Sequence, residues 1–152
     1  MALAVMNYKA INCTRVADYY YSWLTGCNSL TTLNIGENVQ TIPWGAFRGC
    51  SNLTGELTIP ESVISIASDA FAGTSFTTIN YNATNCTYNY TYYYGPFHDC
   101  YTPATLHIGE NVQAIPEQLF SGHTGLTGEL ALPSTLTSIG ESAFRSEERR
   151  VG

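Results

Sequence analysis

Five of the six phenylalanines recur along the chain at a nearly constant interval. The residue numbers of Phe47, Phe71, Phe97, Phe120 and Phe144 differ by 24, 26, 23 and 24 in turn. Self-similarity at a fixed period of this length is the signature of a solenoid. Each coil of a solenoid contacts only its neighbours, and the stacked coils share one continuous core. The spacing therefore predicts a stack of about six coils, with the five side chains in one internal column.

Four of the repeated units carry the same apolar skeleton, with internal gaps of 2, 4, 3 and 5. The skeletons are Leu33, Ile35, Val39, Ile42, Phe47; Leu57, Ile59, Val63, Ile66, Phe71; Leu106, Ile108, Val112, Ile115, Phe120; and Leu130, Leu132, Leu136, Ile139, Phe144. The gap of 2 predicts a strand whose paired side chains point inward. The Val-x-x-Ile pair predicts a second inward-facing side.

The segments that flank these strands predict the corners of each coil. Prolines mark breaks where no ladder donor is needed: Pro43, Pro60, Pro116 and Pro133. The Ala-Phe pairs predict a short helical turn, and the glycines two positions later favour a left-handed stop: Gly49, Gly73 and Gly122. The predicted fold class is therefore an α/β repeat solenoid, rich in β-structure, with a parallel sheet and short helical turns.

A longer period is superimposed on the coils. The segments 36–43, 53–57 and 7–14 recur as 109–116, 126–130 and 80–87, and the offset in residue number is 73 each time. Residues 1–144 are thus interpreted as a solenoid of two 73-residue, three-coil units. Neither end shows a polar capping repeat, so we expect the array to continue in a longer parent protein. Residues 145–152 (RSEERRVG) look like translated sequencing adapter and are interpreted as a non-native tail, the alternative being a solvated charged turn.

Residues 32–50 (TLNIGENVQTIPWGAFRGC) resemble the BspA-like leucine-rich repeat family, and the resemblance covers residues 3 to 144. It implies a right-handed coil, secretion or surface attachment, and adhesion to host matrix proteins and cells, with no adhesive residue fixed by the motif. On this basis we expect a non-enzymatic extracellular binding module for a host protein, matrix or glycan surface. The alternative is a passive structural spacer in a larger cell-surface protein. Leu119 departs from the motif's Ala and His123 from its Cys, and the segment 81–97 lacks Val-x-x-Ile.

Composition excludes several other functions. The chain has 6 basic and 12 acidic residues, a net charge of −6, and so lacks the basic stripe that nucleic acids or anionic membranes require. No apolar stretch reaches the roughly 18 residues needed to span a bilayer, which argues against membrane insertion of this segment. No nucleophile elbow, phosphate loop or histidine pair with metal spacing occurs, so we expect no enzyme, cofactor or metal. The neutral polar surface favours an extracellular or cell-surface location.

The sequence offers two candidate binding surfaces for a protein or glycan ligand. We expect the chain to be monomeric within its longer parent protein. The first is the row of outward strand positions Asn7, Asn34, Thr58, Asn80 and His107, which is either a ligand surface or merely a solvated sheet face. The second is formed by the aromatic stretches Tyr19, Tyr20, Tyr21, Trp23 and Tyr90, Tyr92, Tyr93, Tyr94. Their recurrence in both 73-residue units equally fits rings that cover an apolar edge of their own coil.

The five cysteines leave two interpretations open. Cys27, Cys50 and Cys100 occupy the same position after each Phe-type turn, and Cys13 matches Cys86 in the longer repeat. Stacking brings such positions together, so Cys27 and Cys50 are candidates for a disulfide. The other interpretation is a row of buried free thiols, which pack as small hydrophobic side chains.

Overall fold

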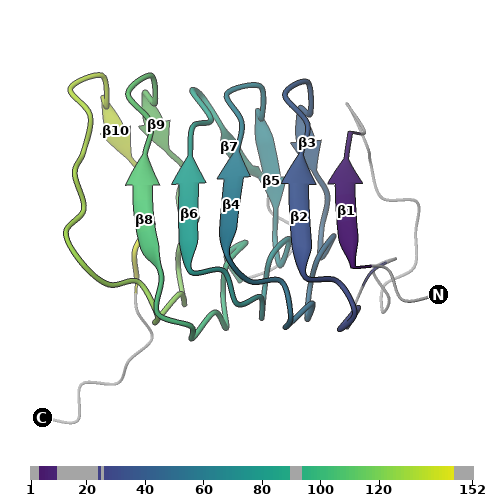
Figure 1. Cartoon of the computed structure of the whole chain (residues 1–152). Coiled ribbons are helices and arrows are strands. Elements are labelled where there is room, and N and C mark those ends of the chain that lie inside the picture. Colours follow the sequence, from purple (N-terminus) through teal and green to yellow (C-terminus); the bar gives the residue numbers. More distant parts are fainter. Residues whose placement is uncertain (1–3, 10–23, 25, 90–93, 146–152) are drawn as a thin grey trace, which may run out of the picture.

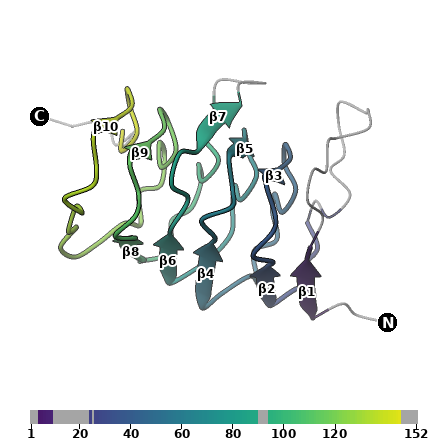
Figure 2. The same ribbon diagram turned by 90° about the horizontal axis from the view of Figure 1, so that it is seen from above.

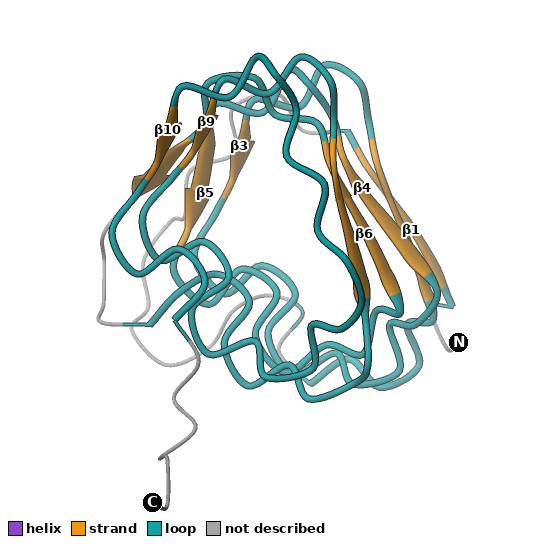
Figure 3. Cartoon of the chain, turned by 90° about the vertical axis from the view of Figure 1, so that its left-hand side faces the viewer, coloured by secondary structure: helices purple, strands orange, loops and turns teal. Residues whose placement is uncertain are grey.

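The computed structural model describes residues 4–9, 24, 26–89 and 94–145, which form a stack of coils with three sides. Figure 3 looks along the stack and shows two sides made of strands and a third made of turns. We number the coils 1 to 6 by their first-side segments: residues 5–8, 32–35, 56–59, 78–81, 105–108 and 129–132. Among the described residues, no helix is long and apolar enough to cross a bilayer.

The first side holds the longest strands, all parallel. They are β1 (Val5–Tyr8), β2 (Thr32–Ile35), β4 (Glu56–Ile59), β6 (Thr78–Tyr81) and β8 (Thr105–Ile108). Their ladders are β1-β2 and β4-β6-β8, with Leu57 opposite Ile79 and Ile79 opposite Leu106. These three side chains are buried, because alternate residues of a strand face the core. The inward pairing that the gap of 2 predicts is therefore confirmed in these coils.

The second side is built from shorter parallel strands. They are β3 (Thr41–Ile42), β5 (Ser65–Ala67), β7 (Thr87–Asn89), β9 (Ala114–Ile115) and β10 (Ser138–Ile139). The ladders are β3-β5-β7 and β9-β10, and a bridge between Asn85 and Ala114 connects the two. Figure 2 shows this row of strands facing the first side across the core.

The third side consists of turns, and the described residues contain no helix. Backbone N–H groups alternate in direction there: Ala46 donates to Pro43 within its coil at 3.2 Å, whereas Phe47 donates to Ala70 of the next coil at 2.8 Å. Every second donor is thus taken by a neighbouring coil, so no i→i−4 helical ladder forms. The expected short helical turns, and with them the α part of the fold class, are not confirmed.

Left-handed residues produce this alternation. They lie two positions before the column Phe (Gly45, Asp69, Gln118, Ser142) and two positions after it (Gly49, Gly73, Asp99, Gly122), with φ between 55° and 76°. Glycine or a short polar residue suits most of these positions, because a Cβ disfavours positive φ. The predicted left-handed glycines are confirmed, although they terminate turns and not helices.

The phenylalanine column is confirmed. Successive ring centroids from Phe47 to Phe144 are 5.6, 4.8, 5.3 and 5.6 Å apart, with interplanar angles between 13° and 27°. The first four rings of the column are buried. Offset stacking of this kind adds about 0.5–1.5 kcal/mol per pair to the burial of apolar area.

The first-side sheet is interrupted between β2 and β4. At the end of the other strands a backbone N–H bridges to the preceding coil: Gly36 donates to Tyr8 at 2.8 Å and Asn82 to Ile59 at 3.0 Å. Pro60 stands at the corresponding place after β4 and has no N–H to donate. β2 and β4 are accordingly not joined in a hydrogen-bonded ladder. Pro133, the equivalent proline of the second 73-residue unit, likewise follows a segment that is not paired with β8.

Three of the five skeleton residues of the last coil are exposed, contrary to the predicted inward packing, whereas Leu136 and Phe144 are partly buried against the core. Leu130, Leu132 and Ile139 are 38%, 49% and 47% exposed, and residues 129–132 form no strand. Their side chains reach the end of the stack, where the described residues place no further coil over them.

Candidate functional site

The outer face of the first side carries the predicted row of polar residues. Asn7, Asn34, Thr58 and His107 are exposed, and Asn80 is half-buried. The amide Nδ2 of Asn34 donates to Oδ1 of Asn7 at 2.9 Å, and that of Asn80 donates to Glu56 Oε1 at 2.6 Å. The β1-β2 ladder places Asn7 opposite Asn34, and the β4-β6-β8 ladder places Thr58, Asn80 and His107 side by side. Hydrogen bonds hold the side chains of Asn7, Asn34 and Asn80.

The interruption between β2 and β4 opens a hollow on this outer face. Its lining is mostly hydroxyl and amide groups, from Thr31, Thr32, Asn34, Thr54 and Thr58, together with the carboxylate of Glu56. Such groups donate and accept hydrogen bonds without a dominant charge. The hollow can therefore accept a neutral polar ligand, and it lacks the aromatic anchors that are typical of protein hot spots.

The aromatic surface is placed only in part. Tyr19, Tyr20, Tyr21, Trp23, Tyr90, Tyr92 and Tyr93 lie outside the described residues. Tyr94 is 53% exposed, and its ring stacks on that of His98 with centroids 4.8 Å apart.

The neighbouring Tyr88 has a structural role. Its hydroxyl donates to the carbonyl of Tyr94 at 2.7 Å and lies 2.8 Å from Oγ of Ser68. Because a phenol has one proton, Ser68 is the donor in that second contact. Burial raises the pKa of Tyr88. The buried Tyr88 thus connects Tyr94 of its own coil with Ser68 of coil 3.

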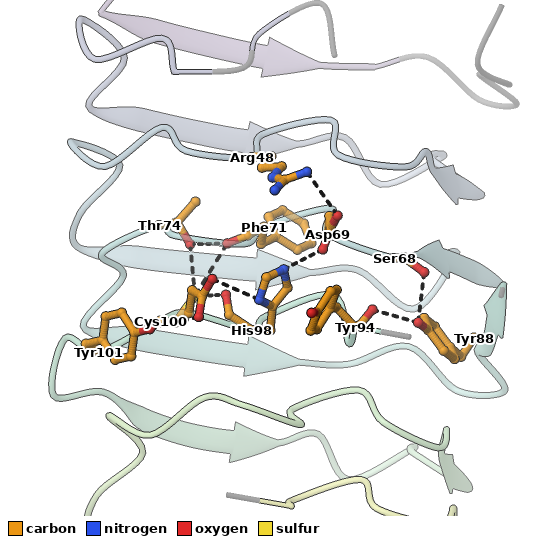
Figure 4. Close-up of polar contacts among 11 residues, drawn as sticks. Arg48, Ser68, Asp69, Phe71, Thr74, Tyr88, Tyr94, His98, Cys100 and Tyr101 are labelled. Atoms are coloured by element: carbon orange, nitrogen blue, oxygen red, sulfur yellow. Dashed lines mark hydrogen bonds and ion pairs between the residues drawn. The ribbon is translucent and has the colours of Figure 1, made fainter. Parts of the chain in front are cut away.

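The third side holds a cluster of charged residues that spans three coils (Figure 4). Asp69 of coil 3 is buried, and its Oδ2 lies 3.3 Å from Nη1 of Arg48 in coil 2. Its other oxygen, Oδ1, lies 2.5 Å from Nε2 of His98 in coil 4. The Arg48 guanidinium also lies 6.0 Å from the centre of the Trp44 ring, within the range of a cation–π contact.

His98 lies between two carboxylates. Its Nδ1 is 3.1 Å from Asp99 Oδ2, and Tyr101 donates to the other oxygen of Asp99 at 2.8 Å. The two ring nitrogens of His98 thus contact acidic side chains of coil 3 and of its own coil. The cluster holds three coils together while Tyr94, Asp99 and Tyr101 stay exposed to solvent.

Arg48, Asp69, His98 and Asp99 were not predicted as a group. The repeat register contains a signal, because Arg48 and His98 each directly follow their column Phe, and Asp69 stands two positions before Phe71. When the coils are aligned on their column Phe, acidic Asp69 of coil 3 falls between basic Arg48 of coil 2 and basic His98 of coil 4.

The four described cysteines (Cys27, Cys50, Cys86 and Cys100) are free thiols, and Cys13 lies outside the described residues. Cys50 donates from Sγ to the carbonyl of Leu24 at 3.1 Å, and Cys100 to that of Phe71 at 3.4 Å, each one coil back. Burial raises the pKa of Cys50, of Cys100 and of Cys86, the last to about 12. These three thiols stay protonated at neutral pH, so they are packing groups and not nucleophiles.

His123 occupies the place of Cys50 and Cys100 in its own coil. Burial lowers the pKa of its imidazole to about 4, so the buried ring is neutral at physiological pH. Its Nδ1 has no hydrogen-bond partner within the described part of the chain. No group of three or more His, Cys, Asp or Glu side chains there is arranged to hold a metal ion.

Comparison with known families gives one match. The family profile described as "BspA type Leucine rich repeat region" matches residues 14–149 in six copies. Neither the curated proteins nor the solved structures contain a significant match.

Proposed function

Because the chain belongs to the BspA-type leucine-rich repeat family, a family of repeat protein-interaction modules, we propose that it is a non-enzymatic, adhesin-like extracellular binding module. Repeats of this type are typical of surface-associated proteins and serve as binding scaffolds. The proposed ligand is a host protein, matrix or glycan surface, and the proposed binding surface is the outer face of the first side.

One observation carries this proposal. The outward row is polar and largely exposed, and part of it is already ordered, with Asn34 bonded to Asn7 and Asn80 bonded to Glu56 across neighbouring coils. Side chains that are fixed before binding lose less conformational entropy when a ligand arrives. The hollow between β2 and β4 adds a concave polar element to this face.

The same bonds also favour the second candidate, a passive spacer. Amide groups that satisfy one another across the ladder need no ligand to complete their hydrogen bonding. The repeated first side would then serve to set the distance between two other parts of a larger protein.

Binding of the purified chain to immobilised matrix proteins and glycans distinguishes the two functions. An Asn34→Ala/Thr58→Ala variant should lose at least tenfold in affinity for any captured ligand. The control is Gln113→Ala, an exposed change away from this face, which should bind as the parent does. Equal loss in both variants would exclude this surface, and a folded chain that binds nothing across a broad panel would support the spacer.

A further inference from the structure

The hollow between β2 and β4 is bordered by backbone groups as well as by side chains. On the β2 side, the N–H groups of Thr32 and Gly36 donate to carbonyls of coil 1. In a parallel sheet, successive residues of a strand direct their N–H and C=O groups to opposite neighbours. The backbone groups of Leu33 and Ile35, which line the hollow, therefore face β4.

The facing strand directs its groups in the same way. The carbonyls of Gly55 and Ile59 accept hydrogen bonds from coil 4, so the backbone groups of Glu56 and Thr58 face β2. No ladder joins β2 and β4, and Pro60 has no N–H with which to extend one. Donors and acceptors of two strands thus border one opening, without the ladder that pairs such groups between the other neighbouring strands of the first side.

The two strands cannot separate to admit a third. At one end of the opening the N–H of Thr54 donates to the carbonyl of Thr31 at 3.4 Å. Coils 2 and 3 are also joined by the β3-β5 ladder and by the rings of Phe47 and Phe71, whose centroids are 5.6 Å apart. A peptide strand binds at a free sheet edge, which this opening does not offer. The hollow instead suits a compact polar group that enters from the outer face.

The side chains around the opening are neutral, with one exception. Thr32, Asn34 and Thr58 contribute hydroxyl and amide groups. Glu56 contributes a carboxylate whose Oε1 accepts from Asn80 at 2.6 Å and whose Oε2 has no partner within the described part of the chain. The described lining contains no Lys, Arg or His. Sugar hydroxyls donate and accept as this mixture does, and a carboxylate is a strong acceptor for them, whereas an acidic sugar would meet Glu56 with no basic group to balance its charge.

We propose that this hollow is a binding site for a neutral saccharide, held by hydrogen bonds from both β2 and β4. The assignment rests on the proposed function and narrows its ligand from a host protein, matrix or glycan surface to an uncharged glycan. Because the described lining contains no aromatic ring, hydrogen bonds alone hold the sugar. A single site should therefore bind weakly, with a dissociation constant on the order of 1 mM.

Titration of the isotope-labelled full chain, followed through its amide resonances, tests the proposal. The probes are a broad panel of neutral oligosaccharides that includes lactose, maltose and cellobiose, with sialyllactose and a heparin oligosaccharide as acidic counterparts. At least one neutral sugar should shift the amides of Leu33, Ile35, Glu56 and Thr58 together. The acidic sugars should leave these four resonances in place.

Two nearly isosteric variants locate the site by affinity. Thr32→Val removes a hydroxyl and Glu56→Gln removes the charge of the carboxylate, so each should weaken binding of the neutral sugar about threefold to tenfold. Thr78→Val is the matched control. It makes the same change at the corresponding position of β6, which is paired on both sides, and should bind as the parent does.

Several results would overturn the proposal. They are shifts confined to other amides, equal affinity in the parent and in both hollow variants, and binding of the acidic sugars at these four amides. If the chain captures immobilised matrix proteins but binds no saccharide of the neutral panel, the assignment of the hollow is wrong while the proposed binding function stands. A folded chain that binds neither proteins nor saccharides contradicts both.

Discussion

Oδ1 of Asp69 lies 2.5 Å from Nε2 of His98, which belongs to the next coil. The Asp69 side chain is 5% exposed, and its other oxygen meets Arg48 of the preceding coil. One buried carboxylate thus links three consecutive coils through two basic residues, Arg48 and His98.

Replacing this carboxylate should weaken the stack. Asp69→Asn keeps a residue that tolerates positive φ but removes the charge, so we expect a loss of about 1–3 kcal/mol in the free energy of unfolding, measured by urea denaturation. Asp99→Asn is the control, and its exposed carboxylate should cost less than about 1 kcal/mol. A double-mutant cycle with His98→Gln should show coupling, and strict additivity would contradict a direct interaction.

The phenylalanine column should show a gradient of stability along the stack. Phe71→Ala removes a fully buried ring with neighbours on both faces, so we expect a loss of about 3–5 kcal/mol in unfolding free energy. Phe144→Ala removes the last ring of the column, whose one stacking partner among the described rings is Phe120, and should cost less than half as much. Equal losses at both positions would argue against a column that ends at Phe144.

Adding one methyl group at Gly95, where two neighbouring coils lie close together, should lower the free energy of unfolding. A Cβ added to Gly95 would lie 2.2 Å from the carbonyl oxygen of Gln118 in the next coil. Gly95→Ala should therefore cost about 3 kcal/mol or more, because the overlapping atom is backbone. Gly55→Ala is the control: nothing lies within 4 Å of its Cβ, so only its φ of +75° opposes the change, at about 1–2 kcal/mol. A thermal unfolding series that ranks Gly55→Ala as the worse variant would refute this.

The free energy of unfolding should decrease as the pH falls, because His123 is buried in its neutral form. Burial lowers its pKa to about 4 in the folded chain, below the ordinary value of 6.5, so the unfolded chain takes up a proton between these values and the folded chain does not. Above pH 6.5 His123 is neutral in both states and does not reduce the free energy of unfolding. As the pH falls towards 4, this free energy decreases by up to about 3 kcal/mol on account of His123.

His123→Cys supplies the comparison for this pH dependence, because it restores the residue found at the matching place in other coils. The variant should have a flatter stability profile between pH 6.5 and 4, measured by urea denaturation at each pH. Since both proteins share every other carboxylate and imidazole, the difference between the two profiles is the quantity to compare. Parallel profiles would contradict the role given to His123.

Much of the solenoid could be predicted because its skeleton is repeated at fixed gaps. The Phe column, the inward pair Leu57 and Ile59, and the outward Asn34 follow from strand alternation and from the stacking of equal units. The predicted helical turn at Ala46-Phe47 was wrong. The sequence alone does not show that the N–H of Phe47 donates to Ala70 of another coil, which prevents a helix there.

The third-side cluster was harder to predict. Its contacts depend on left-handed backbone at Asp69 and Asp99, and on side chains that meet across coils of unequal length. The exposure of Leu130 and Leu132 was also missed, because periodicity marks a residue as apolar but does not say whether another coil lies on it.

The prolines that follow the first-side strands have a consequence for how the coils are held together. Pro60 and Pro133 recur at the 73-residue interval, and at each of them the first-side ladder to the preceding coil is missing. At these two junctions the second-side ladders β3-β5 and β9-β10 and the stacked rings of the phenylalanine column join the neighbouring coils. The prolines thus shift the contact between coils from the first side to the other two sides at a fixed interval of 73 residues.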